Sequence, residues 1–321
     1  MKETTRDTKG MLLLDAGDLL FKKSSNPVAA HDMPMLKERA RVVLKSIEVM
    51  GYDAIGIGDD ELALGKSFLT ELSKTVPVRF LSSNVMDEGS GNPLFQRYLV
   101  KDVNGIKVAV FSLLSPNVFT SQSDSRKKGI VLREPFQTAQ EMVQELGPQA
   151  DILILLSHLG YPADVELAQK LPGLHLILGG HTGVHLANPP IFNGTILLQS
   201  ASKGMYAGRL DLTLLNRERL FYNTATKSSL KANLDQFRRR LASPKATESE
   251  KAQWRRGIES AEKALQQLEG KNYFTHTFFP LSASIQDHPE IGKIVEAYHA
   301  KFPHTEPPPL HDSRGIYSPK R

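Results

Sequence analysis

The sequence predicts a layered α/β fold, and three observations indicate it. From about Met11 to Leu215, short apolar runs of strand length alternate with segments that repeat apolar residues at helical spacing. The length of 321 residues is sufficient to bury a large core. Polar residues such as Asp18 and His158 follow directly after apolar runs, and such strand ends form the ligand-binding edge of open α/β sheets.

The first half of this region contains three expected strands and two expected helices. MLLLDAGD is expected to be a buried strand that runs into a loop. A helix is predicted to begin at Asp32 and Pro34 and to end at Gly51. The strands DAIGIG and VRFLSSN follow, with a helix through Lys66 to Lys74 between them.

The second half contains two hairpins and two buried strands. The alternating flanks LFQRYLVKDV and IKVAVFSLL predict a hairpin around Asn104-Gly105. DILILLSHLG and LHLILGGHTG read as strands that each end in glycine and histidine. IFNGTILLQS contains a second Asn-Gly turn, and we expect YAGRLDLTLL to complete this set of strands.

A different composition begins after Leu215 and predicts a helical hairpin over Lys227–Gly270. Ser243-Pro244 supplies the turn, and Thr247 with Glu250 forms a capping box. Apolar residues recur at intervals of three and four on both sides of the turn: Leu230, Leu234, Phe237 and Leu241, then Trp254, Ile258, Ala261, Leu265 and Leu268. We favour packing of this arm against the domain or a second copy of the chain; docking of another protein is the alternative.

A short helix, HPEIGKIVEAYHAKF, and a proline-rich tail are expected after the arm. The expected organisation is a main domain over residues 1–216, the arm and final helix over residues 217–302, and the tail over residues 303–321.

Composition excludes several functional classes. The chain has no cysteine, which excludes disulfides, thiolate zinc sites and cysteine nucleophiles. Its net charge is +5, but the Lys and Arg residues lie mainly in the last third, interleaved with Glu, so we expect no nucleic-acid partner. No run reaches the roughly 18 apolar residues of a membrane span, so none is expected.

Four polar residues occupy equivalent positions just after predicted strands: Asp18, Asp59, His158 and His181. Carboxylates combined with imidazoles suit Zn, Mn or Fe better than Ca, which prefers oxygen ligands alone. Glycines beside each position allow the sharp turns that bring side chains to one point. The sequence therefore predicts a divalent metal site at this edge.

The order of these blocks resembles the calcineurin-like metallophosphoesterases, and within them the 5'-nucleotidase branch. LLLDAGDLLF resembles the Gly-Asp block of the family, and YDAIGIGDDELALG matches the frame of its Gly-Asn-His-Glu block. LSHLG matches the Ser-His block, GGHTG resembles the Gly-His-x-His block, and NGTILLQSASKGMYAGRLDLTL matches the segment that follows. The resemblance implies a four-layer sandwich of two mixed β-sheets between helices, with hydrolysis of a small phosphorylated substrate by water.

The same resemblance assigns roles to individual residues. It makes Asp18 the ligand that bridges two metal ions, places Asp59 at the asparagine of the second metal, and gives that metal His158 and His181. The Asp-x-His block that opens the family is missing before Asp18, and its second Gly-His-x-His histidine is Gly183 here. We therefore expect at most one ion per chain.

Two further departures affect catalysis. Asp60 stands where the family has a histidine that stabilises the phosphate and leaving group, and Ala63 replaces the acid that orients this histidine. An ionised Asp60 would repel phosphate, and losing such a group typically lowers the rate about 10²–10⁴-fold. Alternatively, Asp60 and Glu61 are acids at a helix start that interact with the helix dipole, which we favour for both.

Two functions follow from these expectations. The first is a metal-dependent phosphoester hydrolase for nucleotides or related phosphates, with reduced activity. The second is a catalytically degenerate domain that binds a metal or, through Lys227–Gly270, a protein partner. The missing first block leads us to expect that the natural chain begins further upstream. A leader there would give a periplasmic location, and its absence a cytoplasmic one.

Overall fold

The computed structural model describes residues 10–21, 27–119, 121 and 123–303. The proline-rich tail, except for its first residue, and the N-terminal residues up to position 9 lie outside this described part. The described residues form two compact units, one within Met1–Ala207 and Pro280–Arg321 and the other within Gly208–Phe279. This division differs from the expected one in two ways. It places the boundary after Ala207 instead of residue 216, and it groups the final helix with the main domain instead of the arm.

The first unit contains a parallel three-stranded sheet, ordered β1-β2-β3, that is covered by two helices. Its strands are β1 (Leu14–Asp15), β2 (Ala54–Gly56) and β3 (Arg79–Leu81). The helices are α1 (Met33–Met50) and α2 (Gly65–Ser73), whose apolar faces share one buried core with the sheet. Gly51 ends α1 in the left-handed conformation, so the predicted helix over this segment is confirmed.

A six-stranded mixed sheet, ordered β10-β11-β9-β8-β6-β5, forms the second sheet of this unit. Its strands are β5 (Tyr98–Val103), β6 (Ile106–Leu114), β8 (Ile152–His158), β9 (Leu176–Gly179), β10 (Ile191–Phe192) and β11 (Thr195–Leu198). The four inner strands are parallel. Both predicted Asn-Gly hairpins are confirmed, and Asn104 and Asn193 have positive φ, as the tight turns require.

Helices α3 (Pro135–Leu146) and α4 (Tyr161–Lys170) share a second buried core with the six-stranded sheet. The two sheets approach each other at β2, whose Gly56 lies against Ser112 of β6 and Leu156 of β8. The order helices, sheet, sheet, helices confirms the predicted four-layer sandwich. A small antiparallel pair, β4 (Val85–Asp87) with β7 (Ile130–Leu132), and the final helix α7 (Pro289–Lys301) complete the unit. Helix α7 packs against α1.

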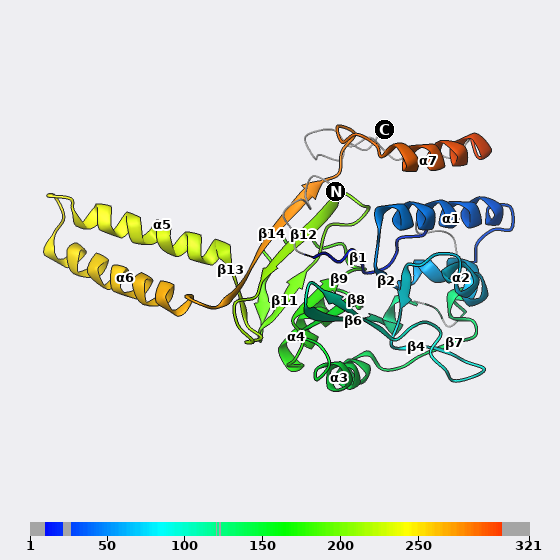
Figure 1. Cartoon of the computed structure of the whole chain (residues 1–321), viewed down its shortest axis with the longest axis horizontal. Helices are drawn as coiled ribbons and strands as arrows, with labels where there is room; N and C mark the ends of the chain where they lie inside the picture. Colours follow the sequence, from blue (N-terminus) through cyan, green and yellow to red (C-terminus); the bar gives the residue numbers. More distant parts are fainter. Residues whose placement is uncertain (1–9, 22–26, 120, 122, 304–321) are drawn as a thin grey trace. The chain divides into compact units, whose positions relative to one another are not determined.

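The second unit contains the predicted helical hairpin, α5 (Thr224–Leu241) and α6 (Glu248–Gln267), whose helices run side by side (Figure 1). The capping box of Thr247 and Glu250 is confirmed. Phe237 lies so close to Gly257 that an added Cβ would meet its ring at 2.9 Å. Among the described residues of the first unit, three segments form short 3-10 helices: η1 (Asp60–Leu64), η2 (Pro116–Val118) and η3 (Ser125–Lys127).

One strand was expected in the wrong sheet. β12 (Tyr206–Thr213) does not join the strands of the sandwich but pairs with β14 (Asn272–Pro280), which pairs in turn with β13 (Phe221–Asn223). The physical reason is that β14, which the sequence reading left out, supplies the hydrogen-bonding edge for β12. No helix within the described residues is both long and apolar enough to cross a bilayer.

The close approach at Gly56 generates a stability prediction. An added Cβ would lie 2.7 Å from Ser112 Oγ and 3.3 Å from Leu156 Cβ, so Gly56→Ala should push the two sheets apart. We expect a loss of about 1–3 kcal/mol in the free energy of unfolding, measured by chemical denaturation. Gly292→Ala in α7 is the matched control, because no described atom lies within 4 Å of its added Cβ, and it should stabilise by about 0.5–1 kcal/mol. Equal losses in both variants would contradict this account.

Candidate metal centre

The loop after β1 places Asp18 at the edge of the parallel sheet in a left-handed conformation, with φ 61°. Gly17 has φ 101°, and its Cα lies so close to the β2 loop that an added Cβ would meet the Gly58 nitrogen. A side chain at Gly58 would overlap the Asp18 carboxylate and come within 2.8 Å of the His158 ring. The two glycines therefore let the β1 and β2 loops and the histidine share one small volume.

The carboxylate of Glu61 joins these two loops. Its oxygens accept hydrogen bonds from the backbone N–H groups of Asp18 (2.7 Å), Leu19 (2.7 Å), Leu20 (3.0 Å) and Gly58 (2.8 Å). The side chain is fully buried. The preferred sequence interpretation of Glu61, an acid that interacts with a helix dipole, is therefore incomplete, because its main contacts are with a loop some forty residues away in the chain.

His158 ends β8 and is fully buried. Its Nδ1 lies 2.9 Å from the carbonyl oxygen of Ala16, and an N–H there donates to that carbonyl. With Nδ1 protonated, the lone pair of a neutral ring lies on Nε2. Nε2 is 3.2 Å from Asp18 Oδ2 and 3.4 Å from Asp59 Oδ1. The ring is thus oriented so that Nε2 can act as a metal ligand.

His181 follows β9 and is the most exposed member of the group, with 37% of its side chain accessible. It adopts a left-handed conformation, φ 66°. Its Nδ1 lies 3.7 Å from Asp59 Oδ1, and its ring centroid is 5.2 Å from that of His158. Gln199 holds this loop by donating to the Gly180 carbonyl and to Thr182 Oγ1.

The structure brings together all four residues that the sequence singles out as metal ligands. One ligand atom from each of Asp18, Asp59, His158 and His181 lies within 4.8 Å of the others. Within the described part of the chain, Asp59 Oδ1 and His158 Nε2 are buried without a hydrogen-bond partner. Orphaned polar atoms of this kind are rare in folded proteins, and a cation between them would satisfy both. The donor set therefore fits a divalent ion.

Neighbouring charges shift the pKa values of His158 and Asp59 in opposite directions. Burial lowers the pKa of His158, but the carboxylates of Asp18 and Asp59 outweigh this effect and raise it to about 11. Burial likewise raises the pKa of Asp59, yet His158 and Arg126 more than reverse this, so the pKa is held below its usual value. Asp59 is therefore ionised at neutral pH, as a metal ligand must be.

Arg126 in η3 also belongs to the site, although the sequence analysis did not predict it. Its Nη1 contacts Asp59 Oδ2 and lies 3.2 Å from Asp60 Oδ1. Its Nε and Nη2 bind the carboxylate of Asp124, with Nη2 2.9 Å from Oδ2. The sequence offered no signal for this contact, because Arg126 follows no strand and lies 67 positions from Asp59. Asp60 is thus paired with a cation instead of standing as an isolated charge.

The loop after β9 leaves little room for a side chain at Gly183. Gly183 has φ 64°, and an added Cβ would lie 3.0 Å from Ser202 Cβ, so a side chain is strained here. His185, two residues further along the chain, stacks on Tyr206 with ring centroids 4.8 Å apart. It does not belong to the metal-ligand group found among the described residues.

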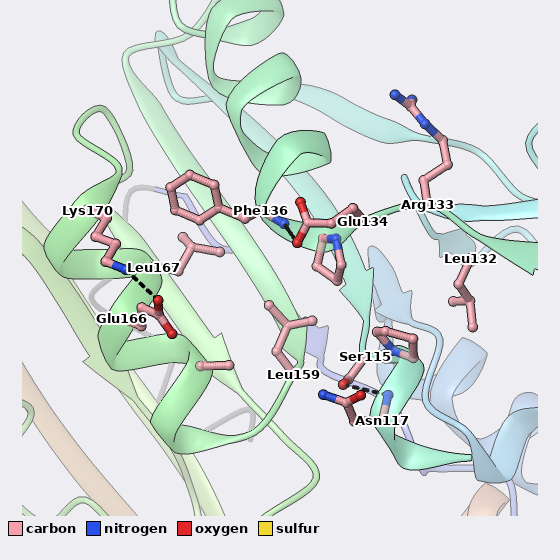
Figure 2. A pocket seen from close by; sticks show the side chains of 13 residues that line it. Ser115, Asn117, Leu132, Arg133, Glu134, Phe136, Leu159, Glu166, Leu167 and Lys170 are labelled. Atoms are coloured by element: carbon pink, nitrogen blue, oxygen red, sulfur yellow. Dashed lines mark hydrogen bonds and ion pairs between the residues drawn. The ribbon is translucent and has the colours of Figure 1, made fainter. Parts of the chain in front are cut away.

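A separate cavity of about 600 Å³ lies between η2, α3 and α4 (Figure 2). Its charged groups are already paired: Lys170 binds Glu166, and Glu134 accepts from the backbone N–H of Phe136 at the start of α3. None of the four clustered residues lines it. The cavity is therefore separate from the cluster.

Comparisons with known proteins find similarity to a nucleotide phosphoesterase and to a 5'-nucleotidase. No protein-family model matches the chain. The chain is 29% identical over 250 residues to the trifunctional nucleotide phosphoesterase protein YfkN of Bacillus subtilis, covering 66% of this chain and 16% of that protein. It is also 29% identical over 239 residues to a 5'-nucleotidase of Vibrio cholerae, covering 65% of this chain and 42% of that protein.

The structural comparison extends beyond the aligned sequence. A crystal structure of the calcineurin-like phosphoesterase YfkN from Bacillus subtilis matches 94% of this chain and 86% of that one, with a TM-score of 0.63 and 17% identity. This likeness concerns the fold alone. The chain spans less than half of the length of the two curated relatives.

The Glu61 contacts generate a second prediction. Glu61→Gln replaces one acceptor oxygen by an amide NH₂, which faces N–H donors and leaves them unpaired. We expect a loss of about 1–3 kcal/mol or more in the free energy of unfolding, measured by chemical denaturation. Glu71→Gln on the exposed face of α2 is the control and should change stability by less than about 0.5 kcal/mol. An unchanged Glu61→Gln protein would show that the carboxylate does not hold the loops.

Proposed function

Because the chain belongs to the calcineurin-like metallophosphoesterases, in their 5'-nucleotidase branch, we propose that it is a metal-dependent phosphoester hydrolase. The proposed substrates are nucleotides or other small phosphate esters, with water as the nucleophile. The proposal draws its substrate class from the relatives, which are a nucleotide phosphoesterase and a 5'-nucleotidase.

One observation carries the proposal: His158 Nε2 and Asp59 Oδ1 are buried 3.4 Å apart as an ion pair, and within the described part of the chain neither atom makes a contact with hydrogen-bond geometry. With Asp18 and His181 they offer two oxygens and two nitrogens to one divalent ion, for which Zn, Mn or Fe is the suitable choice. Such an ion would polarise a phosphoryl oxygen and lower the pKa of the attacking water.

We propose one ion per chain and an activity below that of relatives with complete motifs. Gly183 supplies no ligand, and the His185 ring is stacked on Tyr206. Asp60 occupies the position of the family histidine, and Ala63 replaces the acid that would orient it. A carboxylate paired with Arg126 gives a leaving group less assistance than a positioned acid.

The alternative is a catalytically degenerate domain that binds a metal or a protein partner. The pairing of Asp60 with Arg126 favours it, because it places an ion pair where the family has a histidine. The hairpin within Lys227–Gly270 is the proposed contact for a partner or a second copy. For location, we propose the periplasm where a leader precedes Met1 and the cytoplasm otherwise.

The hydrolase proposal predicts a paired result. Purified protein dialysed against Mn²⁺ or Zn²⁺ should retain about one ion per chain by elemental analysis, as expected for a four-ligand site. It should hydrolyse nucleoside monophosphates. His158→Ala should lower kcat/KM by more than about a hundredfold, beyond the usual effect of removing an outer-shell partner.

The exposed His288, which precedes α7, provides the control: His288→Ala should keep both the ion and the activity. Protein that binds one ion but hydrolyses neither nucleotides nor generic phosphoesters would favour the degenerate domain. Protein that retains no ion and is inert would rule out the hydrolase.

Metal affinity should also depend on pH. Because the pKa of His158 is raised to about 11, the ring carries an extra proton at neutral pH that an ion must displace. The ring without an ion stays protonated throughout this range, but a lower proton concentration favours the exchange of that proton for an ion, so apparent affinity should increase about tenfold per pH unit between about pH 6 and pH 8. Calorimetric titration in two buffers of different protonation enthalpy measures the released proton. An affinity independent of pH would show that no such proton is displaced.

A further inference from the structure

The environment of Arg126 consists of three carboxylates that converge on one guanidinium. Nη1 binds Asp59 and Asp60, while Nε and Nη2 form a two-pronged contact with Asp124. The side chains are largely withdrawn from water: Arg126 is 15% exposed and Asp124 is 3% exposed. Without the cation, three carboxylates would be crowded into a poorly solvated volume, where their mutual repulsion is strong.

The position of Arg126 is fixed by contacts on several sides. The Asp124 carboxylate caps η3 by accepting from the Arg126 backbone N–H at 3.0 Å. The guanidinium lies over the ring of Phe119, 5.5 Å from its centroid. The side chain therefore enters the site with little freedom left, as expected of a group that holds others in place.

Asp59 connects Arg126 with the proposed metal site. Oδ1 faces His158 and His181 at 3.4 Å and 3.7 Å and has no hydrogen-bond partner among the described residues. Oδ2 binds Arg126. One carboxylate thus lies between two cation positions: the proposed metal ligands on one side and a guanidinium on the other.

We infer that Arg126 acts as a positioning residue and supplies a fixed positive charge next to the metal centre. Its guanidinium occupies the place where the carboxylates of Asp59, Asp60 and Asp124 would otherwise hold a second divalent ion. Clustered carboxylate oxygens are the ligands that hard cations such as Mn²⁺ prefer. Because the guanidinium binds Asp59 Oδ2, only Oδ1 of this carboxylate is available as a metal ligand, and the centre is limited to one ion. This inference rests on the proposed metal site.

The test is Mn²⁺ binding to the full chain. Equilibrium dialysis measures the number of ions bound, and electron paramagnetic resonance measures magnetic coupling between neighbouring ions. Wild-type protein should bind one ion and give the spectrum of an isolated Mn²⁺. Arg126→Met, which removes the charge but keeps the three carboxylates, should bind two. The second should bind at least tenfold more tightly than any second ion of the wild type, and the spectrum should show coupling between neighbouring ions.

Three further variants make the result specific. Arg126→Lys keeps a positive charge and should bind one ion. Arg126→Met/Asp60→Asn removes one of the three carboxylates and should bind the second ion more weakly than Arg126→Met, so that the coupled signal appears only at higher Mn²⁺ concentration. Arg133→Met is the matched control, because Arg133 pairs with Glu141 at the surface, and it should behave as wild type. If Arg126→Met fails to fold, Arg126→Met/Asp124→Asn removes the Asp124 charge along with the guanidinium and should still bind a second, weaker ion.

The failures of the two proposals are distinguishable. Wild-type protein that binds no Mn²⁺ would overturn the proposed metal centre itself. One ion in wild type and one ion in every folded variant lacking Arg126 would leave the metal centre standing and overturn the role of Arg126. A lower affinity for the first ion in Arg126→Met, without a second ion, would also overturn it, because the guanidinium would then only orient Asp59.

Discussion

The site depends on one buried carboxylate, Glu61, and the four backbone N–H groups that it accepts from. Three of these donors belong to consecutive residues after β1, and the fourth belongs to the loop after β2. Parallel strands bring their ends to one edge, but they do not fix the loops that follow. Glu61 does so, because each N–H that lost it would be a buried donor without a partner. Asp18 and Asp59 are held on these two loops.

Hydrogen bonds from neighbouring groups also make two unfavourable backbone conformations tolerable at the site. Asp18 and His181 both have positive φ, which costs on the order of 1–3 kcal/mol per residue outside glycine. For Asp18 the backbone N–H is itself bound by Glu61. For His181 the flanking residues are held by Gln199. In both cases contacts made by neighbouring groups fix the strained residue, and the strain aims its side chain into the cluster.

The sequence predicted the parts of the site that follow strands and failed on the parts that do not. Asp18, Asp59, His158 and His181 were found because each comes directly after a strand-like apolar run, and the geometry of parallel sheets brings such positions together. Arg126 could not be found in this way, since a long-range ion pair leaves no local periodicity. The same limit applies to β12, whose pairing is decided by β14, a strand that begins 59 positions after the end of β12.

Arg126 changes the physical meaning of Asp60. Considered alone, an acid in place of a histidine repels a phosphate, and the charge argument points against catalysis. With the guanidinium bound to both Asp59 and Asp60, the acidic character of this loop is partly neutralised before any ion or substrate arrives. However, Arg126 also carries Asp124, so three carboxylates share one positive charge and the cluster remains anionic. At the proposed metal centre, a phosphate would therefore have to be bound mainly through the ion, because the loop itself offers it no unpaired positive charge among the described residues.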